Sequence, residues 1–425
     1  MTILKSGSRG TDVYILQLAL NRAGFLNENP DGIFGVRTQN AVLRFQQSAG
    51  LNTDGIVGVR TWNALLPYLK GYVTHRIIRG DTLWKLSQQY NTSVGAILRA
   101  NVGINPDNLR VGSVIIIPLS FRVVPENVPY TYQLVTFILE GLEARYPFLN
   151  GGTTGKSVMG KSIPFVSIGK GETEIFYNAS HHANEWLTTP VLLKFLEEYS
   201  ESYATNQSIF NVSADELYNK VTLFIVPIVN PDGVDLVNGV VPPGRFLTKA
   251  KRLAENYPYI PYPDGWKANI NGVDLNLQYP ANWERAKEIK YSQGFTAPGP
   301  RDFVGISPLS EPESKAIYDF TRNHNFKLTL SYHSQGEIIY WKYLNFEPEN
   351  SRRIAEYFGE VSGYAVEETP YASGFAGYKD WFIETYDRPG YTIEIGIGMS
   401  PLPLSQFAEI YKDNIGILVG GITEI

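Results

Sequence analysis

Helical and strand-like patterns of hydrophobic residues alternate along the last part of the chain, over about 300 residues. Apolar residues recur at helical spacing in segments 131–146, 188–200 and 311–324. Short apolar runs of the kind found in buried strands occur at residues 173–180, 221–229, 327–334 and 390–396. Because helices packed on a sheet produce this alternation, the pattern predicts an α/β sandwich over residues 125–425.

A short segment near the start of the chain repeats itself. Residues 31–45 recur as residues 54–68, with a period of 23 residues. In each copy an Asp-Gly pair predicts a turn, and Thr38 or Thr61 is expected to cap the helix that follows. An upstream segment with apolar residues at helical spacing completes a small three-helix domain over residues 1–69.

Residues 72–119 predict a strand, two helices and a second strand. The first helix is expected to be capped by Asp81, and the second by Thr92 or Ser93. The closing strand is a β-branched run at residues 114–117 that a proline ends. The segment therefore predicts a compact βααβ domain.

Both N-terminal segments resemble modules that bind the bacterial cell wall. The repeated Asp-Gly-x-x-Gly-x-x-Thr signature resembles the peptidoglycan-binding domain type 1 over residues 3–67. Residues 79–101 and 108–118 together resemble a LysM module. The resemblance implies that the chain binds peptidoglycan, including its N-acetylglucosamine glycan strands. The spacing alone implies no ligand, because repeats and capped helices are also how small domains fold.

The composition of the chain limits both the kinds of partner and the kinds of metal ligand that we expect. The net charge of −5, without a block rich in lysine and arginine, argues against nucleic acid as a partner. The sequence has no cysteine, which leaves histidines and carboxylates to bind a transition metal. No apolar run approaches the roughly 20 residues of a membrane span, and no signal peptide is visible. We expect a location at the cell wall or outside a bacterium, with a cytoplasmic location as the alternative; the oligomeric state stays open.

Three potential metal ligands follow or end predicted strands. His182 and Glu185 stand three residues apart just after the run at 173–180, so both can face one ion. His333 lies near the end of the run at 327–334, at the sheet edge where α/β sites are built. Two imidazoles and a carboxylate suit a catalytic zinc, which takes three protein ligands and leaves one position open. Taken singly, each of these residues is more often structural.

The ligand motif is one of five that occur in the order seen in the M14 metallocarboxypeptidase family. The motifs are His182-Ala183-Asn184-Glu185, Asn230-Pro231-Asp232-Gly233, Asp274-Leu275-Asn276, Ser331-Tyr332-His333-Ser334 and Thr392-Ile393-Glu394. The segment therefore resembles this family over nearly its whole length. The resemblance implies a carboxypeptidase-like sandwich with a mixed central sheet, a single zinc ion (Zn2+) on His182, Glu185 and His333, and peptide hydrolysis.

The resemblance also implies roles for three further residues. Glu394 is expected to be the general base, with a structural ion pair as the alternative reading. Lys267 stands where the family usually has arginine, as the cation for the developing oxyanion. Asp274 is expected to accept the second ring N–H of His182, and its alternative is a simple turn residue.

The expected substrate contacts depart from the family pattern. Family members hold a terminal carboxylate with an Asn-Arg pair, whereas here Asn276 is followed by Leu277, which favours cleavage of an internal bond. Tyr371 matches the substrate-capping tyrosine, with Tyr378 as a rival. With its wall-binding modules, the chain resembles bacterial γ-D-glutamyl-L-diamino acid endopeptidases, which cut stem peptides between γ-D-glutamate and diaminopimelate. A carboxypeptidase that trims the stem and a catalytically silent wall-binding scaffold are the alternatives.

Overall fold

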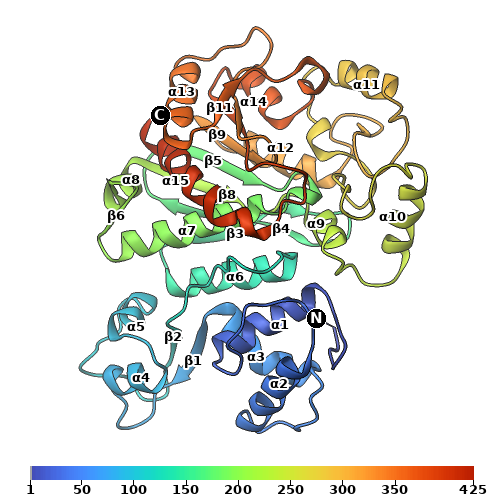
Figure 1. The fold of residues 1–425 in the computed structure, drawn as a ribbon. Coiled ribbons are helices and arrows are strands. Elements are labelled where there is room, and N and C mark those ends of the chain that lie inside the picture. Colours follow the sequence, from blue (N-terminus) through green and yellow to red (C-terminus); the bar gives the residue numbers. More distant parts are fainter. Residues whose placement is uncertain (1) are drawn as a thin grey trace. The chain divides into compact units, whose positions relative to one another are not determined.

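The computed structural model describes residues 2–425, and the chain divides into two compact units (Figure 1). The N-terminal unit comprises the residues up to 129 together with residues 133–150. The second unit comprises residues 130–132 and 151–425. Within residues 2–425, no helix is both long enough and apolar enough to cross a membrane.

The N-terminal unit contains a three-helix domain, a βααβ domain and one further helix. Its elements are α1 (Thr11–Arg22), α2 (Val36–Ser48), α3 (Val59–Lys70), β1 (Tyr72–Arg76), α4 (Leu83–Gln89), α5 (Val94–Ala100), β2 (Val114–Pro118) and α6 (Tyr132–Arg145). Strands β1 and β2 pair antiparallel. Leu86 of α4 and Ile97 of α5 pack with Ile115 and Ile117 of β2 in a small core. Both predicted arrangements are therefore confirmed.

The predicted helix caps in the three-helix domain are wrong. Helices α2 and α3 begin at valines that follow glycine, before Thr38 and Thr61 are reached. The threonine hydroxyls are buried instead, and they accept hydrogen bonds from Gln17 Nε2 (3.1 Å) and Gln46 Nε2 (3.2 Å). Each buried glutamine therefore links its own helix to an Asp-Gly turn of the repeat. The repeat does not predict these contacts, because both glutamines lie outside its two copies.

The caps of the βααβ domain are partly as predicted. Thr82 caps α4 in place of Asp81, and its hydroxyl accepts from the Lys85 backbone N–H (3.2 Å). Asp81 faces His75 Nε2 instead, at 2.9 Å. For α5 the predicted Ser93 is confirmed, since its hydroxyl accepts from the backbone N–H three residues on.

The second unit is built on an eight-stranded sheet with strand order β11-β10-β12-β9-β5-β8-β4-β3. The strands are β3 (Asn150–Lys156), β4 (Ser162–Gly169), β5 (Thr173–Ala179), β8 (Val221–Val226), β9 (Leu328–His333), β10 (Ile338–Tyr340), β11 (Ala365–Glu367) and β12 (Gly390–Glu394). The β12–β9, β9–β5 and β5–β8 pairs are parallel, whereas β10–β12 and β4–β8 are antiparallel. The predicted mixed sheet is confirmed.

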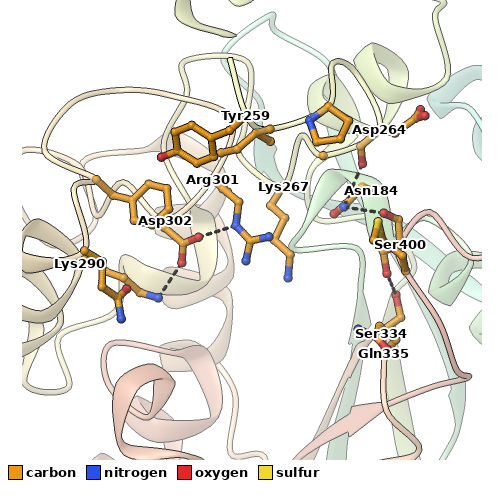
Figure 2. Close-up of a pocket in the computed structure, with 16 residues that line it drawn as sticks. Asn184, Tyr259, Asp264, Lys267, Lys290, Arg301, Asp302, Ser334, Gln335 and Ser400 are labelled. Atoms are coloured by element: carbon orange, nitrogen blue, oxygen red, sulfur yellow. Dashed lines mark hydrogen bonds and ion pairs between the residues drawn. The ribbon is translucent and has the colours of Figure 1, made fainter. Parts of the chain in front are cut away.

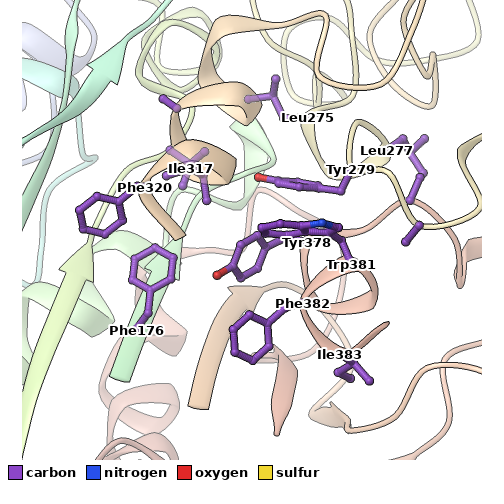
Figure 3. Packing of buried hydrophobic residues seen from close by; sticks show 14 of the residues in the cluster. Phe176, Leu275, Leu277, Tyr279, Ile317, Phe320, Tyr378, Trp381, Phe382 and Ile383 are labelled. Carbon is purple, nitrogen blue, oxygen red and sulfur yellow. The ribbon is translucent and has the colours of Figure 1, made fainter. Parts of the chain in front are cut away.

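Helices cover both faces of this sheet, as successive residues of β5 show. The helices of the unit are α7 (Thr188–Ala204), α8 (Ala214–Lys220), α9 (Pro231–Val237), α10 (Arg245–Glu255), α11 (Trp283–Ser292), α12 (Pro312–Arg322), α13 (Ser351–Ser362), α14 (Tyr378–Tyr386) and α15 (Phe407–Thr423). Phe176 packs against Phe320 of α12 and Tyr378 of α14 (Figure 3). Tyr177 points to the other face, where its ring meets Phe195 of α7 and its hydroxyl donates to a carbonyl of α15. The unit is thus the α/β sandwich that the sequence predicts.

We predict that Gln46→Ala locally destabilises the second Asp-Gly turn. The Gln46 side chain donates to the Thr61 hydroxyl and accepts from the Gly55 N–H (2.9 Å), so its loss leaves buried polar groups unpaired. The free energy of local opening should fall by about 1–3 kcal/mol. Hydrogen exchange of the intact protein, read over residues 52–61, measures this change. Gln47→Ala, at an exposed position of the same helix, is the control, and equal protection in the two variants would contradict the prediction.

Candidate metal centre and active-site cleft

The three predicted metal ligands lie at the carboxyl ends of two neighbouring parallel strands. Strands β5 and β9 pair directly. His182 follows β5 and precedes the 3-10 turn η1 (Ala183–Glu185), and His333 is the last residue of β9. The carboxyl ends of parallel strands meet at one edge of a sheet, and η1 turns Glu185 back toward His182. The structure therefore brings together residues 151 positions apart in the sequence.

The ligand atoms of these three residues lie within 4.8 Å of one another. The Nδ1 atoms of His182 and His333 each lie 2.9 Å from a different oxygen of Glu185, and the two Nδ1 atoms are 3.2 Å apart. Glu185 and His333 are buried. Two imidazole nitrogens and a carboxylate thus converge on one small volume. This is a donor set of catalytic zinc sites, so the residues fit the ion.

Asp274 lies on the far side of His182 from the other two ligands. Its Oδ1 accepts from His182 Nε2 (3.1 Å), which leaves Nδ1 of His182 as the electron-pair donor. The backbone N–H of Asn276 donates to the same oxygen (3.1 Å), and that of Asp302 donates to Oδ2 (3.3 Å). Asp274 is therefore fixed where its predicted role requires it, and that role stays a prediction.

The charged groups around the metal centre raise the pKa of His182 and lower the pKa of Glu185. Burial lowers the pKa of His182, but the carboxylates of Glu185 and Asp274 outweigh burial and raise this pKa to about 9. Burial raises the pKa of Glu185, yet His182 and Lys267 hold it well below its usual range. Lys267 Nζ donates directly to Glu185 Oε1 (2.9 Å). A buried carboxylate that is held ionised in this way can serve as a metal ligand.

Glu394 ends strand β12 and stands opposite His333 in the parallel pairing of β12 with β9. Its side chain lines the same cavity of about 290 Å³ as the two ligand histidines. Burial raises the pKa of Glu394 to about 8, and the negative charge of Glu185 acts in the same direction. A carboxyl group with a raised pKa, facing a cavity beside a metal site, suits proton transfer.

A larger cavity of about 570 Å³ (Figure 2) adjoins the first, and we call the two together the cleft. The smaller cavity holds His182, His333, Glu394 and Asn276. The larger one extends past Tyr259 toward residues 399 and 400. The residues that line both cavities are Lys267, Lys290, Arg301, Asp302, Ser334 and Gln335. These shared residues form the junction of the cleft.

The structure separates the three candidates for substrate contact. Asn276 lines the cleft, and its Oδ1 accepts from the Tyr378 backbone N–H (3.0 Å). Tyr371 is 60% exposed, and its hydroxyl accepts from Arg285 Nε (2.9 Å) rather than lining either cavity of the cleft. The Tyr378 side chain is fully buried in the aromatic cluster of Figure 3, with its hydroxyl against Thr321. Tyr378 cannot reach a substrate, so the rival assignment is wrong.

A sequence model of the zinc carboxypeptidase family matches residues 135–416 of the chain. The chain belongs to this family. Models of the peptidoglycan binding domain and of the LysM domain match residues 9–65 and 75–118. This member of the zinc carboxypeptidase family is therefore a metallopeptidase that also carries a peptidoglycan-binding domain and a LysM domain.

Individual relatives place the chain within the family. It is 44% identical over 396 residues to gamma-D-glutamyl-L-diamino acid endopeptidase 1 of Lysinibacillus sphaericus, which covers 81% of this chain and 98% of the relative. It is 45% identical over 277 residues to protein YqgT of Bacillus subtilis, covering 64% of this chain and 72% of the relative. The crystal structure of carboxypeptidase A from Helicoverpa armigera matches with a TM-score of 0.52 at 20% identity, over 89% of this chain and 84% of that chain. At this identity the structural likeness shows the carboxypeptidase fold alone.

Sequence reasoning missed the charged residues at the junction of the cleft. Lys290 Nζ donates to Asp302 Oδ1 (2.6 Å), and Arg301 Nε donates to Asp302 Oδ2 (2.5 Å). Arg301 and Asp302 follow the proline- and glycine-rich stretch at residues 297–300. No hydrophobic period or motif marks such a stretch, so the sequence alone offered no signal for either residue.

Replacing a ligand should remove zinc from this zinc carboxypeptidase domain. We expect His333→Ala to hold about a tenth or less of the zinc of the wild-type protein at equal free zinc, since loss of even an outer partner costs about 10–100-fold in affinity. Elemental analysis of the dialysed full-length protein measures the bound metal. His75→Ala, which removes a histidine of the LysM domain, should retain zinc at the wild-type level. Full zinc occupancy of the His333→Ala variant would contradict the assignment.

Proposed function

We propose that the chain hydrolyses peptidoglycan stem peptides at the bond between γ-D-glutamate and diaminopimelate, with one zinc ion held by His182, Glu185 and His333. The observation that carries the proposal is this ligand set, whose two histidines line the same cavity as Glu394 in a chain with two wall-binding domains. The Lysinibacillus sphaericus relative, which is named for this activity and aligns over 81% of the chain, supports it.

The residues around the centre can supply the steps of peptide hydrolysis. A bound zinc ion supplies the Lewis acid that polarises the scissile carbonyl and acidifies the attacking water. Glu394 takes a proton from that water and later passes it to the leaving amine. A pKa raised toward neutrality suits both steps, because the same group must accept a proton and then release it. Lys267 provides a positive charge for the developing oxyanion, as a point charge without the fork of an arginine.

The residue after Asn276 favours cleavage within a peptide. Leu277 is 7% exposed and belongs to the hydrophobic core, so this position offers no guanidinium to clamp a terminal carboxylate. We propose that Asn276 contacts the substrate on the leaving-group side of the bond. Tyr371 is the proposed cap, and its exposed side chain must leave Arg285 to cover a substrate.

We assign the wall-binding role to residues 1–69 and 72–119, and catalysis to residues 125–425. Binding of the first two domains to glycan strands holds the peptidase close to stem peptides and raises their effective concentration. The proposed location is the cell wall or the outside of a bacterium. A cytoplasmic enzyme that acts on wall fragments is the second candidate.

Digestion of purified muropeptides by the zinc-loaded full-length protein tests the proposed reaction. Mass spectrometry should detect fragments that end in γ-D-glutamate together with free diaminopimelate peptides. A muropeptide with an amidated terminal carboxyl group should be cut as well as one with a free terminus. Removal of the terminal residue alone would identify a carboxypeptidase, and no hydrolysis would identify a wall-binding scaffold.

Glu394→Gln should retain zinc and lose turnover. Loss of a general acid and base lowers kcat by about 10²–10⁴-fold, whereas the ligand set of the metal is untouched. Steady-state hydrolysis of a synthetic stem peptide, together with the zinc content of the same sample, measures both effects. Glu349→Gln, at an exposed position in the same unit, is the control. Wild-type turnover by Glu394→Gln would exclude Glu394 as the general base.

A further inference from the structure

The junction of the cleft carries more positive charge than its own carboxylates neutralise. Lys290 and Arg301 both donate to the single carboxylate of Asp302, so one positive charge of this trio is left without a counter-ion inside it. Lys267, the third cation of the junction, is paired with Glu185 (2.9 Å). The junction can therefore bind an anionic group of a substrate.

Arg301 is the residue best placed to bind that group. Its only described hydrogen bond runs from Nε to Asp302, and its side chain remains 39% exposed. Figure 2 shows its terminal nitrogens pointing into the same opening as Lys267 Nζ. Asp302 is buried, with 8% of its surface exposed, so it holds the guanidinium in place from the side away from the opening. A guanidinium held in this way presents two parallel donors, the geometry that a carboxylate accepts.

Among the residues that the structure describes, Arg301 is also the one arginine that lines either cavity. The other lysine of the smaller cavity, Lys379, is 4% exposed and donates to the Lys342 carbonyl and the Thr369 hydroxyl. The opposite wall of the larger cavity presents Asn184, whose amide donates to the backbone carbonyls of Asp264 and Ser400. Arg301 is therefore the residue of the cleft that can bind a carboxylate through two hydrogen bonds.

The position of Arg301 determines which carboxylate of the substrate this residue can contact. Arg301 and Lys267 line both cavities, whereas Asn276 and Glu394 line only the smaller one. With Asn276 on the leaving-group side, the acyl part of the substrate passes Lys267 toward the larger cavity. In a γ-linked glutamyl residue, two methylene groups and the α-carbon separate the scissile carbonyl from a free α-carboxylate. An ordinary α-linked peptide has a negative charge at that distance only where the residue is itself a glutamate, whose amino group then stands next to the scissile carbonyl.

We propose that Arg301 binds the free α-carboxylate of the γ-linked glutamyl residue and thereby determines specificity for substrates that carry this carboxylate. This inference rests on the proposed function, because it names the group by which the same cleft recognises its substrate. The carboxylates of diaminopimelate are the other source of the same chemistry. Separate amidation of the glutamyl and the diaminopimelate carboxylates distinguishes these two sources.

Three synthetic substrates test the assignment: L-Ala-γ-D-Glu-meso-diaminopimelate, its glutamyl α-carboxamide, and its analogue with both carboxylates of diaminopimelate amidated. The wild-type enzyme should prefer the free glutamyl carboxylate over its amide by about 10–100-fold in kcat/KM, the range expected for a charge-assisted hydrogen bond. Arg301→Gln should abolish this preference by slowing cleavage of the free carboxylate alone. Arg301→Lys, which keeps the charge without the fork, should retain part of it. Arg252→Gln, at an exposed position outside the cleft, should behave as the wild type.

Binding of the product L-Ala-D-Glu, measured by calorimetry, makes the same comparison without turnover and should weaken by about 10–100-fold in Arg301→Gln. An unchanged preference in Arg301→Gln, or an equal loss on the free acid and its glutamyl amide, overturns the inference while the proposed function stands. A preference that follows amidation of diaminopimelate instead also overturns it. If the wild-type enzyme cuts none of the three substrates, the proposed function fails together with the inference.

Discussion

The Glu185 carboxylate is a buried negative charge, and the active-site end of the molecule is organised around the need to compensate it. A carboxylate removed from water is costly unless positive charge and hydrogen-bond donors surround it. Here two imidazoles approach its two oxygens, and Lys267 Nζ donates to one of them. A divalent cation between the imidazoles and the carboxylate supplies the same compensation more completely. The requirement for compensation therefore links the stability of this region to its chemistry.

The supporting residues are held by the packing of the second unit. His181, next to a ligand, is fully buried, and its Nε2 pairs with the Tyr279 hydroxyl (2.9 Å). The Tyr279 ring stacks on Trp381 of α14 within the cluster of Figure 3. Burial and the neighbouring histidines hold the pKa of His181 well below its usual value, so it stays neutral beside the centre. A tightly packed core of this kind limits the movement of the ligands that it supports.

Much of this arrangement could be predicted from the sequence, for reasons that differ between residues. Buried strands have a clear hydrophobic signature, and parallel strands meet at one edge, so His182 and His333 could be expected to lie together. The buried positions of Thr38 and Thr61 could not be predicted, because buried glutamines on other helices bind their hydroxyls in place of the expected helix caps. Arg301 lies in an irregular segment whose position depends on tertiary contacts alone. The exclusion of Tyr378 likewise required its burial to be known.

The proposed chemistry depends most on two imidazoles and one carboxylate sharing a single ion. X-ray absorption spectroscopy at the zinc edge of the zinc-loaded full-length protein tests this directly. We expect a first shell of nitrogen and oxygen at about 2.0–2.2 Å, with the outer-shell scattering of two imidazole rings. A first shell with the scattering of three imidazoles, or of oxygen ligands alone, would contradict the assignment of His182, Glu185 and His333.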